Sequence, residues 1–126
     1  MKRLPDTEFS VMQGLWSAMK ECPDSPISTV SLKELLEKER SWNMSALQTV
    51  LSRLEEKGFV KSEKSGRNRF YTVLISEEDY LTEESRSFFG RIGGKKLTSL
   101  VAALYDNNDI TDSDLEELKK FIDSKK

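Results

Sequence analysis

The chain has 126 residues, of which 37% are hydrophobic and 33% are charged, and its net charge is −2. With no histidine and one cysteine, Cys22, it lacks the residues for most zinc sites, for histidine-assisted nucleophiles and for an internal disulfide, so we expect no enzyme, metal or cofactor. No apolar run approaches the ~18 residues of a transmembrane helix, and residues 1–10 lack the apolar segment of a signal peptide. These features predict a cytoplasmic protein.

The first apolar pattern runs from residue 6 to residue 19 with helical spacing, and a proline-containing loop is expected at 21–28. Ser31 and Glu34 match a capping box, which predicts a short helix that starts at Ser31. Asn43 is predicted to cap a helix over 43–57 whose inner side chains follow a single stripe. We expect Trp42 to anchor that helix in the core, with a role as a wedge near the backbone as the alternative.

A hairpin is predicted to follow this helix. Gly58 stands where a left-handed helix end is expected, and strands are predicted at 59–63 and 69–74 around a turn at 64–68. Helix, helix, helix and hairpin in this order predict a winged helix-turn-helix domain over residues 1–75. The predicted fold class is therefore mainly α with a small β-wing.

Residues 76–126 are predicted to form a second, helical region. Ser76 and Thr111 are expected to cap helices, and Gly93-Gly94 is expected to separate two of them. Because short helices with such apolar stripes cannot bury them alone, we expect a homodimer, with packing back onto residues 1–75 as the alternative. The expected dimerisation residues are Tyr80, Leu81, Phe88, Phe89, Leu97, Leu100, Val101, Leu104, Leu115, Leu118, Phe121 and Ile122.

The outer side of helix 43–57 carries small and amide side chains that suit a DNA major groove, namely Ser45, Ala46, Gln48 and Thr49. Arg53 is expected to clamp a phosphate or to support the helix internally. The chain is acidic overall, but residues 61–69 carry four basic side chains against one acid, Glu63. Within this cluster Lys64, Arg67, Asn68 and Arg69 are expected to contact phosphates or the minor groove.

Other interpretations of the same residues stay open. The polar helix face and the charged hairpin can be ordinary solvent-exposed surfaces, as in a winged-helix module that binds proteins and no DNA. A ligand-sensing regulator with a pocket among Tyr80, Phe88, Phe89 and Tyr105 is a third reading, although aromatic stripes on helices are more often core.

Several motifs resemble those of the penicillinase and methicillin-resistance repressors, the BlaI/MecI/CopY family. They are Glu8-Phe9-Ser10-Val11-Met12 with Leu15-Trp16, Leu47-Gln48-Thr49-Val50-Leu51-Ser52-Arg53-Leu54-Glu55-Glu56-Lys57-Gly58, Phe70-Tyr71, Ser99-Leu100-Val101 and Leu115-Glu116-Glu117-Leu118. The resemblance covers nearly the whole chain. It implies a dimeric repressor that binds a palindromic operator, with recognition contacts at Ser45, Ala46, Gln48 and Thr49 and a wing from Arg67 to Tyr71.

Two family features are replaced in this chain. The β-lactam-responsive members are cleaved at an Asn-Phe bond, and a membrane-bound sensor protease is the partner that this implies, but Ala103-Leu104 stands at the matching positions. The copper-responsive members end in a Cys-x-Cys metal site, which this chain lacks.

Overall fold

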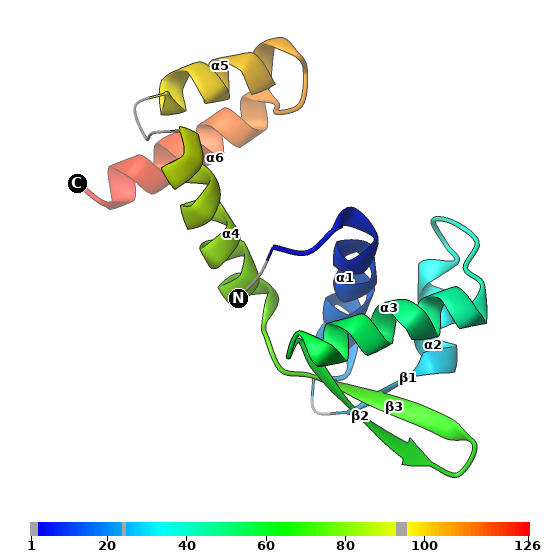
Figure 1. The fold of residues 1–126 in the computed structure, drawn as a ribbon. Coiled ribbons are helices and arrows are strands. Elements are labelled where there is room, and N and C mark those ends of the chain that lie inside the picture. Colours follow the sequence, from blue (N-terminus) through cyan, green and yellow to red (C-terminus); the bar gives the residue numbers. More distant parts are fainter. Residues whose placement is uncertain (1–2, 24, 93–95) are drawn as a thin grey trace. The chain divides into compact units, whose positions relative to one another are not determined.

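The computed structural model describes residues 3–23, 25–92 and 96–126 (Figure 1). The chain folds into two compact units, Met1–Ser85 and Arg86–Lys126. The first unit contains α1 (Asp6–Glu21), β1 (Ile27–Ser28), α2 (Thr29–Leu36), α3 (Met44–Glu56), β2 (Val60–Ser65) and β3 (Asn68–Val73). The helix α4 (Glu77–Ile92) begins there, and α5 (Leu97–Asp106) and α6 (Asp112–Ser124) belong to the second unit. The predicted helical fold with a small β-wing is confirmed.

The core of the first unit is made where α1, α2 and α3 pack together against the sheet. The predicted inner stripe of α3 is buried, and Trp42 is buried below it, with the Arg40 guanidinium 4.4 Å from its ring centre. Each fully buried leucine stabilises the unit by about 2 kcal/mol relative to an exposed one. The largest completely buried side chains are Phe59, Met12, Leu15, Leu32, Leu47, Leu51, Leu54, Val11 and Val60.

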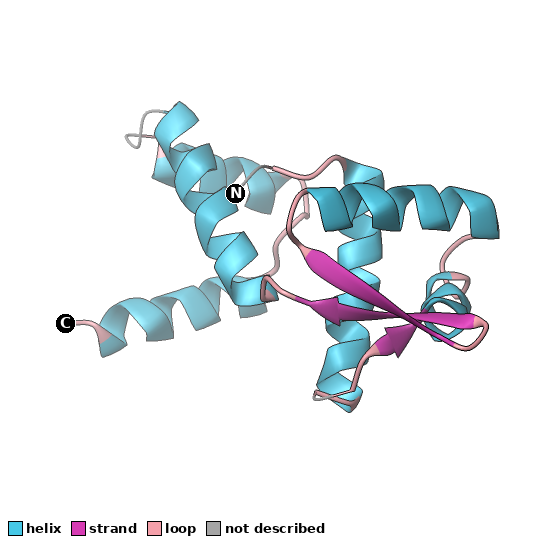
Figure 2. Cartoon of the chain, turned by 60° about the horizontal axis from the view of Figure 1, so that its bottom comes forward, coloured by secondary structure: helices cyan, strands magenta, loops and turns pink. Residues whose placement is uncertain are grey.

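The sheet has three antiparallel strands in the order β1-β3-β2 (Figure 2). The sequence did not predict β1, which lies in the segment expected to be a loop, where Ile27 pairs with Tyr71. The hairpin turn is shorter than expected and consists of Gly66 and Arg67 between paired Ser65 and Asn68. Gly66 has φ +62°, which the first residue of a tight type II′ turn requires.

The start of α2 corrects the sequence prediction. Its N-cap is Ser28, whose Oγ accepts a hydrogen bond from the Ser31 backbone N–H at 3.1 Å, and the helix begins at Thr29. The backbone is extended at Ser28 and helical from Thr29, so Ser31 already lies within the first helical turn. The capping-box pattern at Ser31 and Glu34 therefore lies inside the helix.

The end of α3 is a Schellman motif, as Gly58 predicts. Gly58 has φ +83°, its N–H donates to the Glu55 carbonyl at 3.0 Å, and the Phe59 N–H donates to the Leu54 carbonyl at 2.9 Å. These bonds satisfy carbonyl groups that the helix leaves without partners. The motif also turns the chain directly into β2, so it fixes where the hairpin starts relative to α3.

Tyr80 corrects an expectation about the dimer. Its side chain is only 3% exposed, its hydroxyl accepts from the Leu4 backbone N–H at 2.9 Å, and its ring lies 5.6–5.8 Å from the rings of Phe9, Trp16 and Phe59. Tyr80 therefore belongs to the core of the first unit and offers nothing to a partner chain or to a ligand pocket. It also explains why that unit extends beyond residue 75, to Ser85.

The helices after the hairpin have the predicted caps. Ser76 Oγ accepts from the Asp79 N–H at 3.1 Å, and Thr111 forms a complete capping box with Asp114 at the start of α6. The break predicted at Gly93-Gly94 lies outside the described residues. Among the described residues, no helix is both long and apolar enough to cross a membrane.

Candidate nucleic-acid interface

The exposed side of α3 begins at a well-formed N-cap. Asn43 Oδ1 accepts from the backbone N–H groups of Ser45 at 2.8 Å and Ala46 at 3.4 Å, as the sequence predicts. Because the inner stripe of α3 is buried, Ser45, Ala46, Gln48 and Thr49 are exposed. The Thr49 hydroxyl donates to the Ser45 carbonyl at 3.1 Å, so its methyl group and the accepting side of its hydroxyl oxygen are left for outside contacts.

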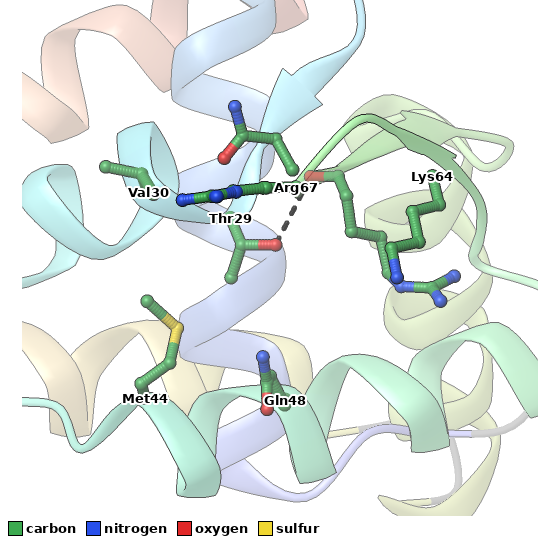
Figure 3. A pocket seen from close by; sticks show the side chains of 8 residues that line it. Thr29, Val30, Met44, Gln48, Lys64 and Arg67 are labelled. Carbon is green, nitrogen blue, oxygen red and sulfur yellow. Dashed lines mark hydrogen bonds between the residues drawn. The ribbon is translucent and has the colours of Figure 1, made fainter.

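A cavity of about 340 Å³ lies between α3, the start of α2 and the hairpin (Figure 3). Met44 and Gln48 point into it from α3, Thr29 and Val30 border it from α2, and Lys64 and Arg67 come from the hairpin. Asn68 and Arg69 complete the lining. Among the described lining residues three are cationic and none is acidic, so the cavity attracts anions such as phosphate.

The structure brings five of the ten predicted contact residues together, because Gln48, Lys64, Arg67, Asn68 and Arg69 border one cavity. Arg53 is also exposed on α3, but it is not among the residues that line this cavity.

Sequence reasoning missed three residues that line the same cavity, Thr29, Val30 and Met44. Thr29 and Val30 were missed because α2 was expected to begin only at Ser31. Thr29 is buried, and its hydroxyl donates to the Arg69 carbonyl at 3.3 Å, which ties α2 to β3. Serine and threonine at 28–29 are the signal that a helix start and its link to the hairpin lie there.

Tyr71 does not belong to this surface, contrary to the expectation based on family resemblance. Its side chain is 4% exposed, and it lies opposite Ser62 and Ile27 in the sheet. Burial raises the pKa of its hydroxyl, while the positive charge of Arg69 opposes part of that rise. Tyr71 is therefore a core residue beneath the wing.

Arg69 has a partner within the protein. Its guanidinium Nη1 donates to Ser62 Oγ at 2.9 Å, so one of its donors is already engaged. Lys64, Arg67 and Asn68 are exposed. Arg69 is exposed too, so all four basic side chains of the wing, Lys61, Lys64, Arg67 and Arg69, lie at the surface, and Arg69 also holds a hydrogen bond within the fold.

Comparison with known proteins connects this geometry to a family. Residues 4–124 match the family model described as penicillinase repressor. The chain is 32% identical to the penicillinase repressor of Bacillus licheniformis over 100% of this chain and 96% of that protein. It is 25% identical to the methicillin resistance regulatory protein MecI of Mammaliicoccus sciuri over 97% and 94% of the two chains.

A solved structure agrees with this match. The solution structure of the DNA-binding domain of the repressor BlaI aligns with a TM-score of 0.50 and 35% identity, covering 64% of this chain and 94% of that one. The family resemblance indicated by the sequence motifs is thereby confirmed. The chain belongs to the penicillinase repressor family, and it is a DNA-binding transcriptional repressor, not an enzyme.

Proposed function

We propose that two copies of this chain form a homodimer that binds a palindromic operator in the cytoplasm and represses transcription by occluding a promoter. The single observation that supports the DNA-binding surface best is the cationic cavity beside the exposed side of α3. A helix flanked by cations on one side suits a groove edge, where the helix meets the bases and the cations meet phosphates.

Within this proposal, the residues divide into two groups. Ser45, Ala46, Gln48 and Thr49 meet base edges in the major groove, since Gln can bond adenine and the methyl groups can contact thymine. Lys64, Arg67 and Asn68 contact the phosphate backbone from the wing, and Arg53 does so from α3. The first group sets the sequence preference and the second supplies affinity that depends on salt.

Self-association is proposed because the second unit leaves many of its large apolar side chains exposed, while Leu100, Val101, Leu104 and Leu115 are half-buried. Among the described residues of Arg86–Lys126 none is buried. Its exposed large hydrophobic side chains are Phe88, Phe89, Leu97, Tyr105, Leu118, Phe121 and Ile122. A two-fold interface between two copies would cover them with the same surface from each chain. We therefore assign DNA binding to residues 1–75 and pairing to residues 76–126, apart from Tyr80.

Relief of repression by a membrane-bound protease would meet a structural obstacle at Ala103–Leu104. Both residues lie within α5, and the Ala103 carbonyl accepts bonds from the Asn107 backbone N–H at 3.1 Å and from its side chain at 2.9 Å. Proteases cut extended, exposed chain, so α5 would have to unwind before cleavage there.

Selection of bound duplexes from a random pool tests the proposal. We expect an enriched inverted repeat whose half-sites are separated by about one or two helical turns, with a salt-dependent affinity. Sedimentation equilibrium should give two chains in free solution and two chains per duplex. No enrichment would contradict DNA binding and favour a protein-interaction module. An enriched single half-site bound by one chain would contradict the dimer alone.

A further inference from the structure

A chain of hydrogen bonds joins α3 to both strands of the wing. The Glu55 carboxylate on α3 accepts from the Ser62 backbone N–H at 3.1 Å and from Ser62 Oγ at 2.9 Å. The same Ser62 Oγ accepts from Arg69 Nη1 on β3 at 2.9 Å. We call Glu55, Ser62 and Arg69 the wing link, because a single serine hydroxyl connects the DNA-reading helix with the hairpin.

The strand register explains why Arg69 reaches this serine. Arg69 lies directly opposite Lys64 in the β2–β3 pairing, and Ser62 lies two residues before Lys64 on the same face of β2. The Arg69 guanidinium reaches along the diagonal to Ser62 Oγ, and the Ser62 hydroxyl in turn donates to the Glu55 carboxylate.

The backbone of Arg69 is held as well. Its carbonyl accepts from the Thr29 hydroxyl at 3.3 Å, so β3 is tied to α2 at the same residue whose side chain is tied to α3 through Ser62. The exposed cations Lys64 and Arg67 stand on the hairpin that these bonds hold. The position of those cations relative to α3 therefore depends on the wing link.

We propose that Arg69 is a positioning residue, which acts through Ser62 and Glu55 to hold the wing at one spacing from α3 while Lys64 and Arg67 contact phosphates. This inference rests on the proposed DNA binding. It differs from a direct phosphate contact by Arg69, because such a contact would not need Ser62. The two roles make opposite predictions for the pair Ser62 and Arg69.

A double-mutant cycle separates the two roles. Ser62→Ala and Arg69→Ala should each weaken operator binding about three- to tenfold, as loss of a hydrogen bond implies, and the double variant should be no weaker than Arg69→Ala alone. The salt slope, which is the change of the logarithm of the binding constant with the logarithm of the salt concentration, should also be the same for Ser62→Ala and Arg69→Ala. If Arg69 contacts a phosphate, the two losses multiply, and Arg69→Ala lowers the slope by about 0.9 more than Ser62→Ala does.

Conservative and matched variants complete the experiment. Ser62→Thr keeps the hydroxyl and should restore wild-type affinity, which a purely steric role for the serine would not predict. Glu55→Gln should weaken binding relative to Glu56→Gln, because the two variants change the charge of α3 equally and only Glu55 belongs to the wing link. Melting temperatures of all variants show whether the first unit stays folded.

Each result of these binding experiments supports a single conclusion. Unchanged or tighter binding by a folded Ser62→Ala variant overturns the wing link, since a released Arg69 would then serve DNA at least as well. Failure of the wild-type chain to bind any selected duplex overturns the proposed function instead. Multiplying losses for Ser62 and Arg69 leave the proposed function standing and return Arg69 to the direct contacts.

Discussion

Lys57 Nζ lies 2.5 Å from Glu8 Oε1, which joins the end of α3 to the first turn of α1. Glu8 is only 5% exposed, so its carboxylate is largely removed from water. A buried carboxylate without a partner is costly, and Lys57 is the partner that the fold provides. This pair therefore fixes the DNA-reading helix on the scaffold at the end opposite Asn43.

Removal of the lysine should cost stability because it leaves Glu8 buried and unpaired. We expect Lys57→Met to lower the free energy of unfolding by about 1–3 kcal/mol in urea titrations. Lys20→Met is the matched control, since Lys20 lies on the surface 3.8 Å from Glu77 and should change stability by about 0.5 kcal/mol or less. Equal effects of the two variants would show that burial of Glu8 does not matter.

Gly58 should not tolerate a side chain, because its φ of +83° is unfavourable for other residues. We expect Gly58→Ala to destabilise the first unit by about 1–2 kcal/mol in thermal unfolding. Gly90 lies inside α4 with open space around the position of a Cβ, so Gly90→Ala should stabilise that helix by about 0.5–1 kcal/mol. The same sign for both variants would contradict the assigned role of Gly58.

These local features were predictable because each depends on a few neighbouring residues. Asn43 and Thr111 signal helix starts by their own side chains, and Gly58 signals a left-handed turn by lacking one. The strand β1 was missed because two residues carry no periodic pattern. The start of α2 was misplaced because Ser28 and Ser31 both fit a cap, and only the extended backbone at Ser28 decides between them.

The sequence predicted the DNA-binding and dimer surfaces in outline. The prediction was wrong for residues whose role depends on packing. An alternating strand does not reveal which face will be covered, and Tyr71 is on the covered face of β3. Tyr80 looks like a dimer residue in a helical stripe, yet it fills the first unit's core. The bond between Arg69 and Ser62 depends on strand register, which was not predicted residue by residue.

The buried hydroxyl of Tyr71 should make stability depend on alkaline pH. Burial raises its pKa in the folded state above the unfolded value near 10, so the unfolded chain loses this proton first. The contribution of the protonated Tyr71 hydroxyl to the free energy of unfolding is complete below about pH 10, and it is lost as the pH rises through the folded-state pKa. We expect Tyr71→Phe to make urea stability fall less steeply than wild type above pH 10. Parallel curves would show that the hydroxyl ionises freely.

Gln48 and Arg67 should affect DNA binding in different ways, as measured by fluorescence anisotropy on a selected operator and on random duplex. Gln48→Ala should cost about 1–3 kcal/mol on the operator and little on random DNA, because a base contact is lost. Arg67→Ala should weaken binding to both and lower the salt slope by about 0.9. An equal loss on both duplexes for Gln48→Ala would remove it from the base-reading residues.

Phe121 tests the proposed homodimer, because its side chain is 59% exposed on α6 of the single chain. Burial of a phenylalanine is worth about 2 kcal/mol, and a two-fold interface contains it twice, so Phe121→Gln should weaken dimerisation at least a hundredfold. Lys120→Gln, an exposed neighbour on the same helix, should leave the dimer dissociation constant within about threefold of wild type. Sedimentation equilibrium measures both constants, and operator binding by Phe121→Gln should then require higher protein concentrations. An unchanged dimer in Phe121→Gln would place the interface on another face of the second unit.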